Sequence, residues 1–109
     1  MLLEINFSGI DLSGAKLSGF DLRDINLSEA NLSRVDFSWA NLSRANLSRV
    51  SAAHWGHMSG ANLSGCKMLG VNLENANTKG ARLGVLASAF VRNTINPDGD
   101  LIEGPITIE

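Results

Sequence analysis

The sequence repeats a five-residue word, and this period restricts the fold more than any other feature. Residues 30–49 read ANLSR VDFSW ANLSR ANLSR. Each word holds a small or branched apolar residue, then Asn or Asp, then Leu or Phe, then Ser, then a variable residue. A period of five fits neither the 3.6 residues per turn of an α-helix nor the two-residue alternation of a β-strand. It does fit a coil in which every word forms one side and ends in a turn.

The same register extends over most of the chain. A large apolar residue recurs every five residues from Phe7 to Leu47, and the pattern resumes at Met58 and continues to Leu83. Met58 lies eleven residues after Leu47 instead of ten, so one residue is inserted near residues 51–55. We expect the insertion to bulge outward, because a close-packed core cannot shift its phase.

The word closely resembles the A-(D/N)-L-x-x repeat of the pentapeptide-repeat family, over roughly residues 5–83. The resemblance implies an all-β fold, a right-handed quadrilateral parallel β-helix with about twenty residues per coil. For this chain it implies about four coils plus an irregular C-terminal cap. We expect a β-helical domain over residues 1–96, and a C-terminal turn with an extended tail over residues 97–109.

A coil of twenty residues makes a prediction that the charges support. Residues twenty apart would be vertical neighbours at the ladder spacing of about 4.8 Å. Three such pairs have opposite charges: Lys16–Asp36, Asp24–Arg44 and Glu29–Arg49.

The C-terminal part leaves two alternatives open. The apolar residues of the segment 84–93 have helical spacing, which is typical of a short capping helix, but a distorted last coil is our preferred interpretation. Pro97-Asp98-Gly99 is then a turn, and residues 101–108 form an extended segment that covers the open end. Because the N-terminal end has no predicted cap, its open β-edge favours a homodimer through the ends of the helix.

Composition excludes several classes of function. The formal net charge of −2 gives no strong attraction to nucleic acid or to an anionic membrane, so direct nucleic-acid binding is not expected. No apolar run reaches the ~20 residues that a membrane span needs, and no signal peptide is apparent. The single cysteine, Cys66, excludes an intramolecular disulfide and suggests a reducing compartment, so we expect a cytoplasmic protein.

No catalytic, metal or cofactor site is predicted. His54 and His57 form an H-x-x-H pair, but Cys66 occupies an inward position of its word, and a fourth ligand is missing. The many serines recur because the turn recurs, and neither histidine has a committed carboxylate partner. We therefore expect neither an enzyme nor a cofactor.

The outward aromatic residues are more informative. Trp39 lies at an outward position, and the insertion is expected to place Trp55 outside the regular core. With Arg34, His54 and His57 they would form one patch, and exposed tryptophan with arginine is typical of interface hot spots. The alternative is that Trp55 folds over its own insertion and Trp39 leans on it.

These features support two hypotheses about the function. The leading hypothesis is a non-enzymatic rigid scaffold, a protein–protein interaction module whose partner the sequence does not identify. The alternative rests on the resemblance, which includes members that mimic duplex DNA and bind DNA gyrase or another DNA-binding protein. Five arginines interrupt the acidic residues, which weakens this alternative, because mimicry needs a continuous negative surface.

Overall fold

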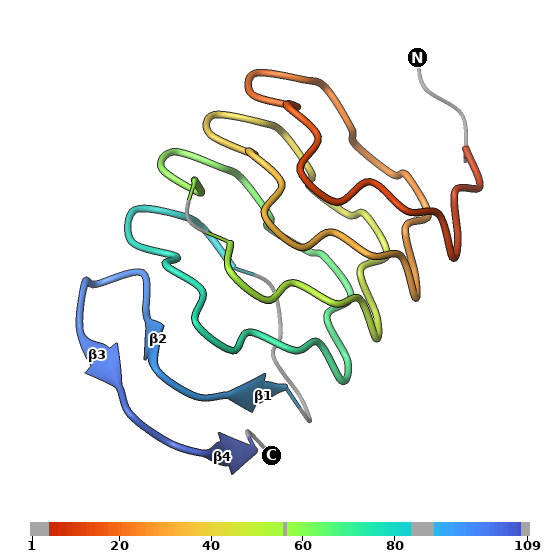
Figure 1. Ribbon diagram of the computed structural model, residues 1–109. Helices are drawn as coiled ribbons and strands as arrows, with labels where there is room; N and C mark the ends of the chain where they lie inside the picture. Colours follow the sequence, from red (N-terminus) through yellow and green to blue (C-terminus); the bar gives the residue numbers. More distant parts are fainter. Residues whose placement is uncertain (1–4, 56, 84–88, 108–109) are drawn as a thin grey trace.

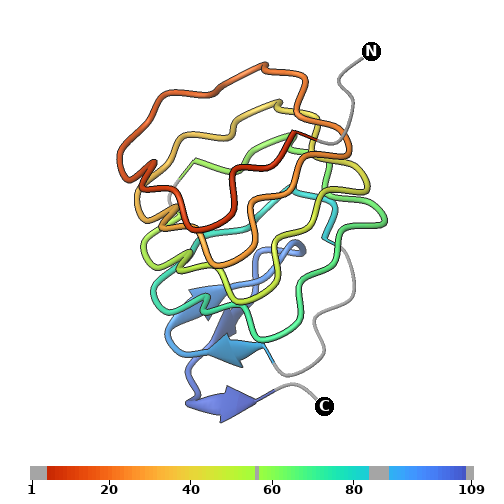
Figure 2. The same cartoon turned by 90° about the vertical axis from the view of Figure 1, so that its right-hand side faces the viewer.

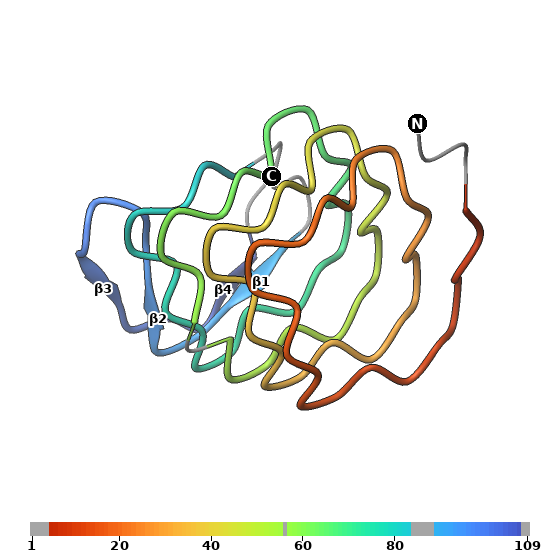
Figure 3. The same cartoon turned by 90° about the horizontal axis from the view of Figure 1, so that it is seen from above.

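The computed structural model describes residues 5–55, 57–83 and 89–107. The chain winds into a solenoid whose coils stack one on another, and its two ends lie at opposite ends of the stack (Figure 1). The stack runs from the first coil to the strands of the C-terminal segment in the two perpendicular views (Figures 2 and 3). Its principal extents are 38 × 23 × 22 Å, so the molecule is a short rod.

A tight turn ends each word and explains the five-residue period. In the word that begins at Ala30, the amide of Val35 donates to the carbonyl of Leu32 at 3.2 Å. Arg34, the third residue of this turn, has a φ of 61°, the left-handed value that a type II turn requires. The Asn31 side chain accepts from the amide of Ser33, so an Asn or Asp before the leucine also fixes the turn.

Parallel β-bridges set the register between coils. Before the insertion the partners are twenty residues apart, as in Asn6↔Asn26 and Asn31↔Ser51. Across it they are twenty-one apart, as in Asp36↔His57. The coil of twenty residues is therefore confirmed, and the extra residue lies between Ser51 and His57. The expected outward bulge itself cannot be followed, because residue 56 lies outside the described residues.

Four short strands form the C-terminal segment: β1 (Phe90–Val91), β2 (Thr94–Ile95), β3 (Leu101–Ile102) and β4 (Ile106–Thr107). Strands β1 and β2 continue the stack, because Phe90 bridges Asn72 and Ile95 bridges Asn77. Strand β3 pairs antiparallel with β2, and β4 pairs antiparallel with β1. Residues 84–88 lie outside the described part, and no helix occurs in the described remainder of segment 84–93.

Side chains fill the inside of the coils, and burial increases away from the first coil. Leu32, Leu42 and Leu47 are fully buried, whereas the corresponding Leu12 and Leu22 of the first coil are only half-buried. Phe20, at a position that alanine occupies in the later coils, is 51% exposed. Among the described residues, the apolar interior is thus continuous along the rod and less buried in the first coil.

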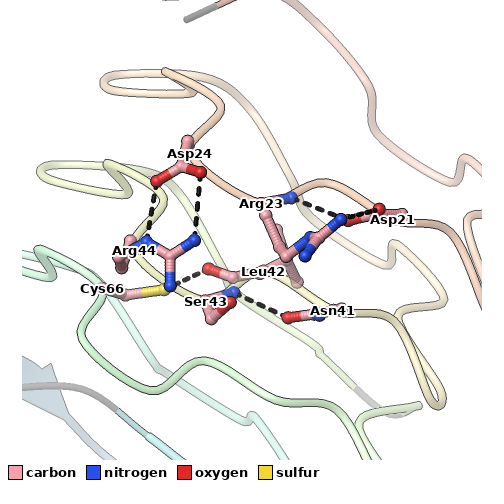
Figure 4. A network of polar contacts seen from close by, with 8 residues as sticks. All are labelled: Asp21, Arg23, Asp24, Asn41, Leu42, Ser43, Arg44 and Cys66. Atoms are coloured by element: carbon pink, nitrogen blue, oxygen red, sulfur yellow. Dashed lines mark hydrogen bonds and ion pairs between the residues drawn. The ribbon is translucent and has the colours of Figure 1, made fainter. Parts of the chain in front are cut away.

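The stacked charges follow the predicted register. Arg44 binds both oxygens of Asp24 one coil below, and its Nε lies 2.9 Å from Oδ1 (Figure 4). Arg49 approaches Glu29 at 3.6 Å. Lys16 and Asp36 are vertical neighbours as predicted, although no ion pair within 4.0 Å joins them among the described residues. These pairs are solvent-exposed, so they align the coils more than they stabilise them.

Cys66 is part of this interior. It is 3% exposed, and its Sγ donates to the carbonyl of Leu42 at 2.8 Å (Figure 4). Burial raises the pKa of the Cys66 thiol to about 11, which keeps it protonated and unreactive at neutral pH. The inward position predicted for this residue is confirmed.

Candidate interaction surface

The predicted patch falls on one side of the coil and on the two corners that border it. Arg34 and His54 are twenty residues apart and lie at the same corner of successive coils, and both have a left-handed φ. We call such a vertical series of equivalent corner residues a corner column. Trp39 lies at the next corner, with a φ of 62°, and its amide donates to the carbonyl of Ser59 in the coil above. His57 lies on the side between these corners, where it bridges Asp36. Four of the five predicted residues are therefore brought to one region, and all four are exposed.

Trp39 is the most exposed large apolar residue of the described part, with 72% of its surface accessible. Its ring lies over Gly60 in the next coil, where an added Cβ would be only 2.2 Å from Cε3 of the ring. The same corner column carries Gly19 below and Gly80 above. Tryptophan thus occupies a position where glycine is the conformationally natural residue, and the adjacent glycine leaves room for its ring.

Trp55 does not belong to this surface, and the prediction that it lies outside the core is wrong. It is 0% exposed, and its indole Nε1 donates to the carbonyl of Leu32 at 2.7 Å. Its ring meets Phe37 edge-on, with ring centres 5.5 Å apart and planes at 83°. The physical reason is a volume deficit: Ala52 stands where other coils of the same side carry leucine, and the indole reaches into that side of the interior.

A shallow pocket of about 330 Å³ opens on the same side of the coil, one coil above Trp39. Ser38, Ser59 and Lys79 line it from three successive coils, together with Met58, Gly80 and the outward residues His57 and Asn77. Lys79 was not among the residues that the sequence predicted for this surface. The repeat register could have found it, since Lys79 follows Thr78 as Ser59 follows Met58. We call the surface formed by Lys16, Arg34, Asp36, Ser38, Trp39, His54, His57, Ser59, Asn77 and Lys79 the Trp39 face.

The Trp39 face is more basic than the rest of the molecule. It carries the cations Lys16, Arg34 and Lys79, and Asp36 is its one carboxylate, in a chain whose overall net charge is −2. Asp36 accepts hydrogen bonds from the hydroxyl and the amide of Ser38, and these lower the pKa of its carboxyl group. It therefore remains charged at neutral pH, so the face as defined carries three cations and one carboxylate. At its edge, Gly99 lies against the Lys79 side chain, between Asp98 and Asp100 in the sequence.

In the described ranges, no three histidine, cysteine or acidic side chains gather closely enough to hold a metal ion. No helix among the described residues is long and apolar enough to cross a membrane. An exposed ring, a shallow pocket and a positive field are features of a recognition surface.

Gly60→Ala is expected to displace the Trp39 ring, because the new methyl group would overlap it. Gly14→Ala is the matched control: Gly14 has nearly the same φ, 74° against 72°, but an added Cβ there meets nothing within 4 Å. Both variants should lose about 1 kcal/mol of stability from the left-handed backbone. In ¹⁵N-edited NMR spectra only Gly60→Ala should shift the indole N–H signal of Trp39. An equal shift in both variants would contradict the contact.

The repeats of the chain match a known family. The family model described as pentapeptide repeats matches eight copies, over residues 5–44 and 57–83. A pentapeptide-repeat protein from the Arabidopsis thaliana thylakoid lumen is 25% identical over 82% of this chain, with a TM-score of 0.44. HetL from the cyanobacterium Nostoc, described as involved in heterocyst differentiation regulation, is 27% identical over 93% of this chain, with a TM-score of 0.38.

The chain spans 66% and 57% of the lengths of these two structures. No curated protein matches the chain in sequence. The family match covers more than half of the chain, skips the insertion and follows the repeats that build the stack. The chain belongs to the pentapeptide-repeat family.

Proposed function

We propose that this protein is a non-enzymatic scaffold that binds an acidic segment of another protein through the Trp39 face. In this proposal the repeats form a right-handed quadrilateral rod of about four coils. Pentapeptide-repeat proteins are generally structural or interaction modules, which supports the class of function. The interior is filled by side chains, so recognition has to use the outer surface.

The conformation of Trp39 is the observation that carries the proposal. A left-handed backbone costs about 1–2 kcal/mol for a residue other than glycine. The 72% exposure of the ring means that little burial offsets this cost. A bulky apolar side chain in a strained and exposed position is poorly explained by stability. It is well explained by contact with a partner, since tryptophan dominates binding energies at interfaces.

The charge around Trp39 suggests the chemistry of the partner. Lys16, Arg34 and Lys79 lie on or beside one side of the coil, and Asp36 is the one carboxylate among the residues of the Trp39 face. Asp98 and Asp100 flank Gly99, which lies against Lys79 at the edge of this face. Elsewhere on the surface Asp21, Asp24, Glu29 and Glu74 are paired with arginine. An acidic segment would therefore be steered to the Trp39 face, and its binding would weaken as salt rises.

The same ion pairs argue against mimicry of duplex DNA. Four carboxylates share their surroundings with guanidinium groups, so the acidic residues do not form the continuous negative surface that a duplex presents. We therefore do not favour gyrase as the partner. A reducing compartment, and hence the cytoplasm, remains our proposal for the location, on the basis of the single buried Cys66.

Trp39→Gly tests the proposal without threatening the fold. Glycine relieves the left-handed strain, so the free energy of unfolding should stay the same or rise by up to about 1 kcal/mol. Truncation of a central hot spot should weaken binding at least tenfold, which is about 1.4 kcal/mol. Proteins captured from the source cell on the wild type should be lost on Trp39→Gly, and titration of the purified partner should give the affinity ratio.

Leu69→Ser is the matched control. Leu69 is also a large apolar residue, 49% exposed, but it lies on another side of the coil. This variant should capture the same proteins as the wild type. Equal capture by the wild type and Trp39→Gly would contradict the proposed site. Loss with both variants would show that the captured proteins bind apolar surface without selecting the Trp39 face.

A further inference from the structure

The side of the coil that carries the Trp39 face has two regular columns of outward positions. Five levels of the stack follow one another along this side, from the word of Leu17 to strand β2. At each level one outward position precedes the inward residue and another follows it. The first column contains Lys16, Asp36, His57, Asn77 and Ile95, and the second contains Ser18, Ser38, Ser59, Lys79 and Pro97. A partner that lies flat on this side meets both columns at every level.

The two edges of this side differ in chemistry. Arg34 and His54 lie in the corner column of one edge, at the second and third levels. Trp39 lies in the corner column of the other edge, also at the second level, and its ring covers Gly60 at the third. An edge that carries arginine and histidine is therefore matched, at the same levels, by an edge that carries tryptophan.

We infer that the Trp39 face binds a second copy of the chain, related by a two-fold axis that runs parallel to the rod between the two facing sides. Such an axis exchanges the two edges but keeps every level opposite the same level of the second copy. Arg34 of each copy then faces Trp39 of the other, and His54 faces the part of the ring that covers Gly60. Each contact occurs twice, as a two-fold interface requires.

The contact between the edges supplies the main attraction. Tryptophan and arginine are the residue types that dominate binding energy at interfaces, and a guanidinium group over an indole ring is a favourable cation–π arrangement. The Trp39 ring is 72% exposed. Arg34 takes part in no ion pair within the described part of the chain. Both side chains are therefore available to the second copy.

The columns are compatible under the same axis, which sets each residue of the first column against the residue of the second column at its own level. The charged residues Lys16, Asp36 and Lys79 then each face serine or asparagine, so like charges do not meet in the columns. At the fifth level Ile95 faces Pro97, and both are half-buried in the single chain. The side is thus complementary to itself in polarity as well as at its edges.

An antiparallel arrangement of the two rods is less favourable. An axis perpendicular to the rod sets each column against itself with the levels reversed, and overlap of all five levels places the axis at the third. His57 then meets His57 of the second copy, and Lys16 meets Ile95. Burial of a charged group against an apolar one is costly, because the charge loses hydration without gaining a partner.

The size of this side predicts a weak dimer. Five levels at the ladder spacing of about 4.8 Å and a width of 22 Å offer about 500 Å² on each copy, near the lower limit of specific interfaces. Dimerisation should therefore depend on concentration in the micromolar range or above. The dimer covers the Trp39 face, so, on the basis of the proposed function, an acidic segment would bind the monomer and compete with dimerisation.

Sedimentation velocity of the purified full chain over a range of concentrations tests the dimer. Arg34→Glu and Trp39→Gly should each raise its dissociation constant at least tenfold, because either variant removes the contact between the edges. Glutamate and glycine both occur at corners with a left-handed φ, as in Glu29 and Gly60, so the variants should fold, as circular dichroism can verify. Lys67→Glu is the control: it reverses a cation on the opposite side of the coil and should dimerise like the wild type.

NMR tests the direction of the axis. In a mixture of isotope-labelled and unlabelled chains, at concentrations that populate the dimer, nuclear Overhauser effects are expected between the Arg34 side chain and the Trp39 ring. These residues lie at opposite edges of one copy, so the signal reports a contact between copies. Contacts between the Trp39 rings of the two copies instead would contradict the parallel axis.

A wild type that stays monomeric at all concentrations, or a dimer that survives Arg34→Glu, would overturn the inference. Neither result touches the proposed function, because these measurements use the chain without a partner. Conversely, a dimer whose Trp39→Gly variant captures the same proteins as the wild type would overturn the proposed function and leave the dimer standing.

Discussion

Replacing Trp55 by alanine is expected to lower the free energy of unfolding by about 3–5 kcal/mol, the usual cost of removing a large aromatic side chain from a core. Three losses combine. The indole is fully buried, so its removal leaves a cavity beside Phe37. The edge-to-face contact between the two rings disappears. The carbonyl of Leu32 also loses the hydrogen bond from Nε1, and a buried acceptor without a partner is destabilising.

Chemical denaturation of three variants measures this effect. Trp55→Phe keeps most of the volume but removes the donor, so it should lose less stability than Trp55→Ala. Trp39→Ala truncates the other tryptophan of the chain at an exposed position, and it should change the free energy of unfolding by less than about 1 kcal/mol. Similar losses from the two alanine variants would contradict the different environments of the two tryptophans.

Leu42→Ala is expected to lose about 2–5 kcal/mol of unfolding free energy, and Leu22→Ala distinctly less. Both leucines belong to one column of the stack, one coil apart, and differ in burial. Leu42 has a coil above it and a coil below it, as the bonds from Leu22 to Asn41 and from Leu42 to Asn62 show. Leu22 lies in the first described coil and is half-buried, so less apolar contact is lost on its truncation.

This pair of variants measures the stacking itself. The side chain and the change are identical, so the difference in free energy between the two variants reports the contribution of the neighbouring coil. Equal losses would mean that the first described coil is as well covered as the second, which would contradict the difference in burial between the two leucines.

The five-residue period predicted the inward columns, and the resemblance of the word to the pentapeptide-repeat family implied the coil of twenty residues that sets the vertical register. This succeeded because every word imposes the same local turn, and a local rule repeated along the chain determines the global stack. The pairs Asp24–Arg44 and Glu29–Arg49 follow directly from it. Lys16 and Asp36 share the register, but the Asp36 carboxylate is held by its own Ser38. The two residues are therefore vertical neighbours as predicted, while a hydrogen bond within its own word orients the Asp36 carboxylate.

The insertion limited what could be predicted about the candidate surface. The sequence shows that one residue is extra, but not which residue keeps its place in the register. Trp55 lies five residues after Val50 and retains the inward position, which the count from Met58 had obscured. Ala52 was the overlooked signal, since it leaves unfilled space in a column that carries Leu32 and Leu73. Volume along a column is a property of the stack and cannot be judged from a single word.

The Asn and Asp side chains of the words help to fix the turns. Where Asn or Asp precedes the leucine, its side chain accepts a hydrogen bond from the amide two residues later, as in Asn41 and Ser43 (Figure 4). Asn and Asp have the correct reach for this Asx turn. Serine contributes its amide there, which explains why Asn or Asp recurs in the words as regularly as leucine.

The central claim is that backbone hydrogen bonds join residues one coil apart. Couplings between ¹⁵N and ¹³C′ across hydrogen bonds, observed by solution NMR, test it directly. The account predicts a coupling from the amide of Leu22 to the carbonyl of Asn41, and one from the amide of Leu42 to the carbonyl of Asn62, both across 2.7 Å bonds. The second pair is one residue further apart in sequence because it spans the insertion. Couplings from these amides to carbonyls four residues earlier, as in an α-helix, would contradict it.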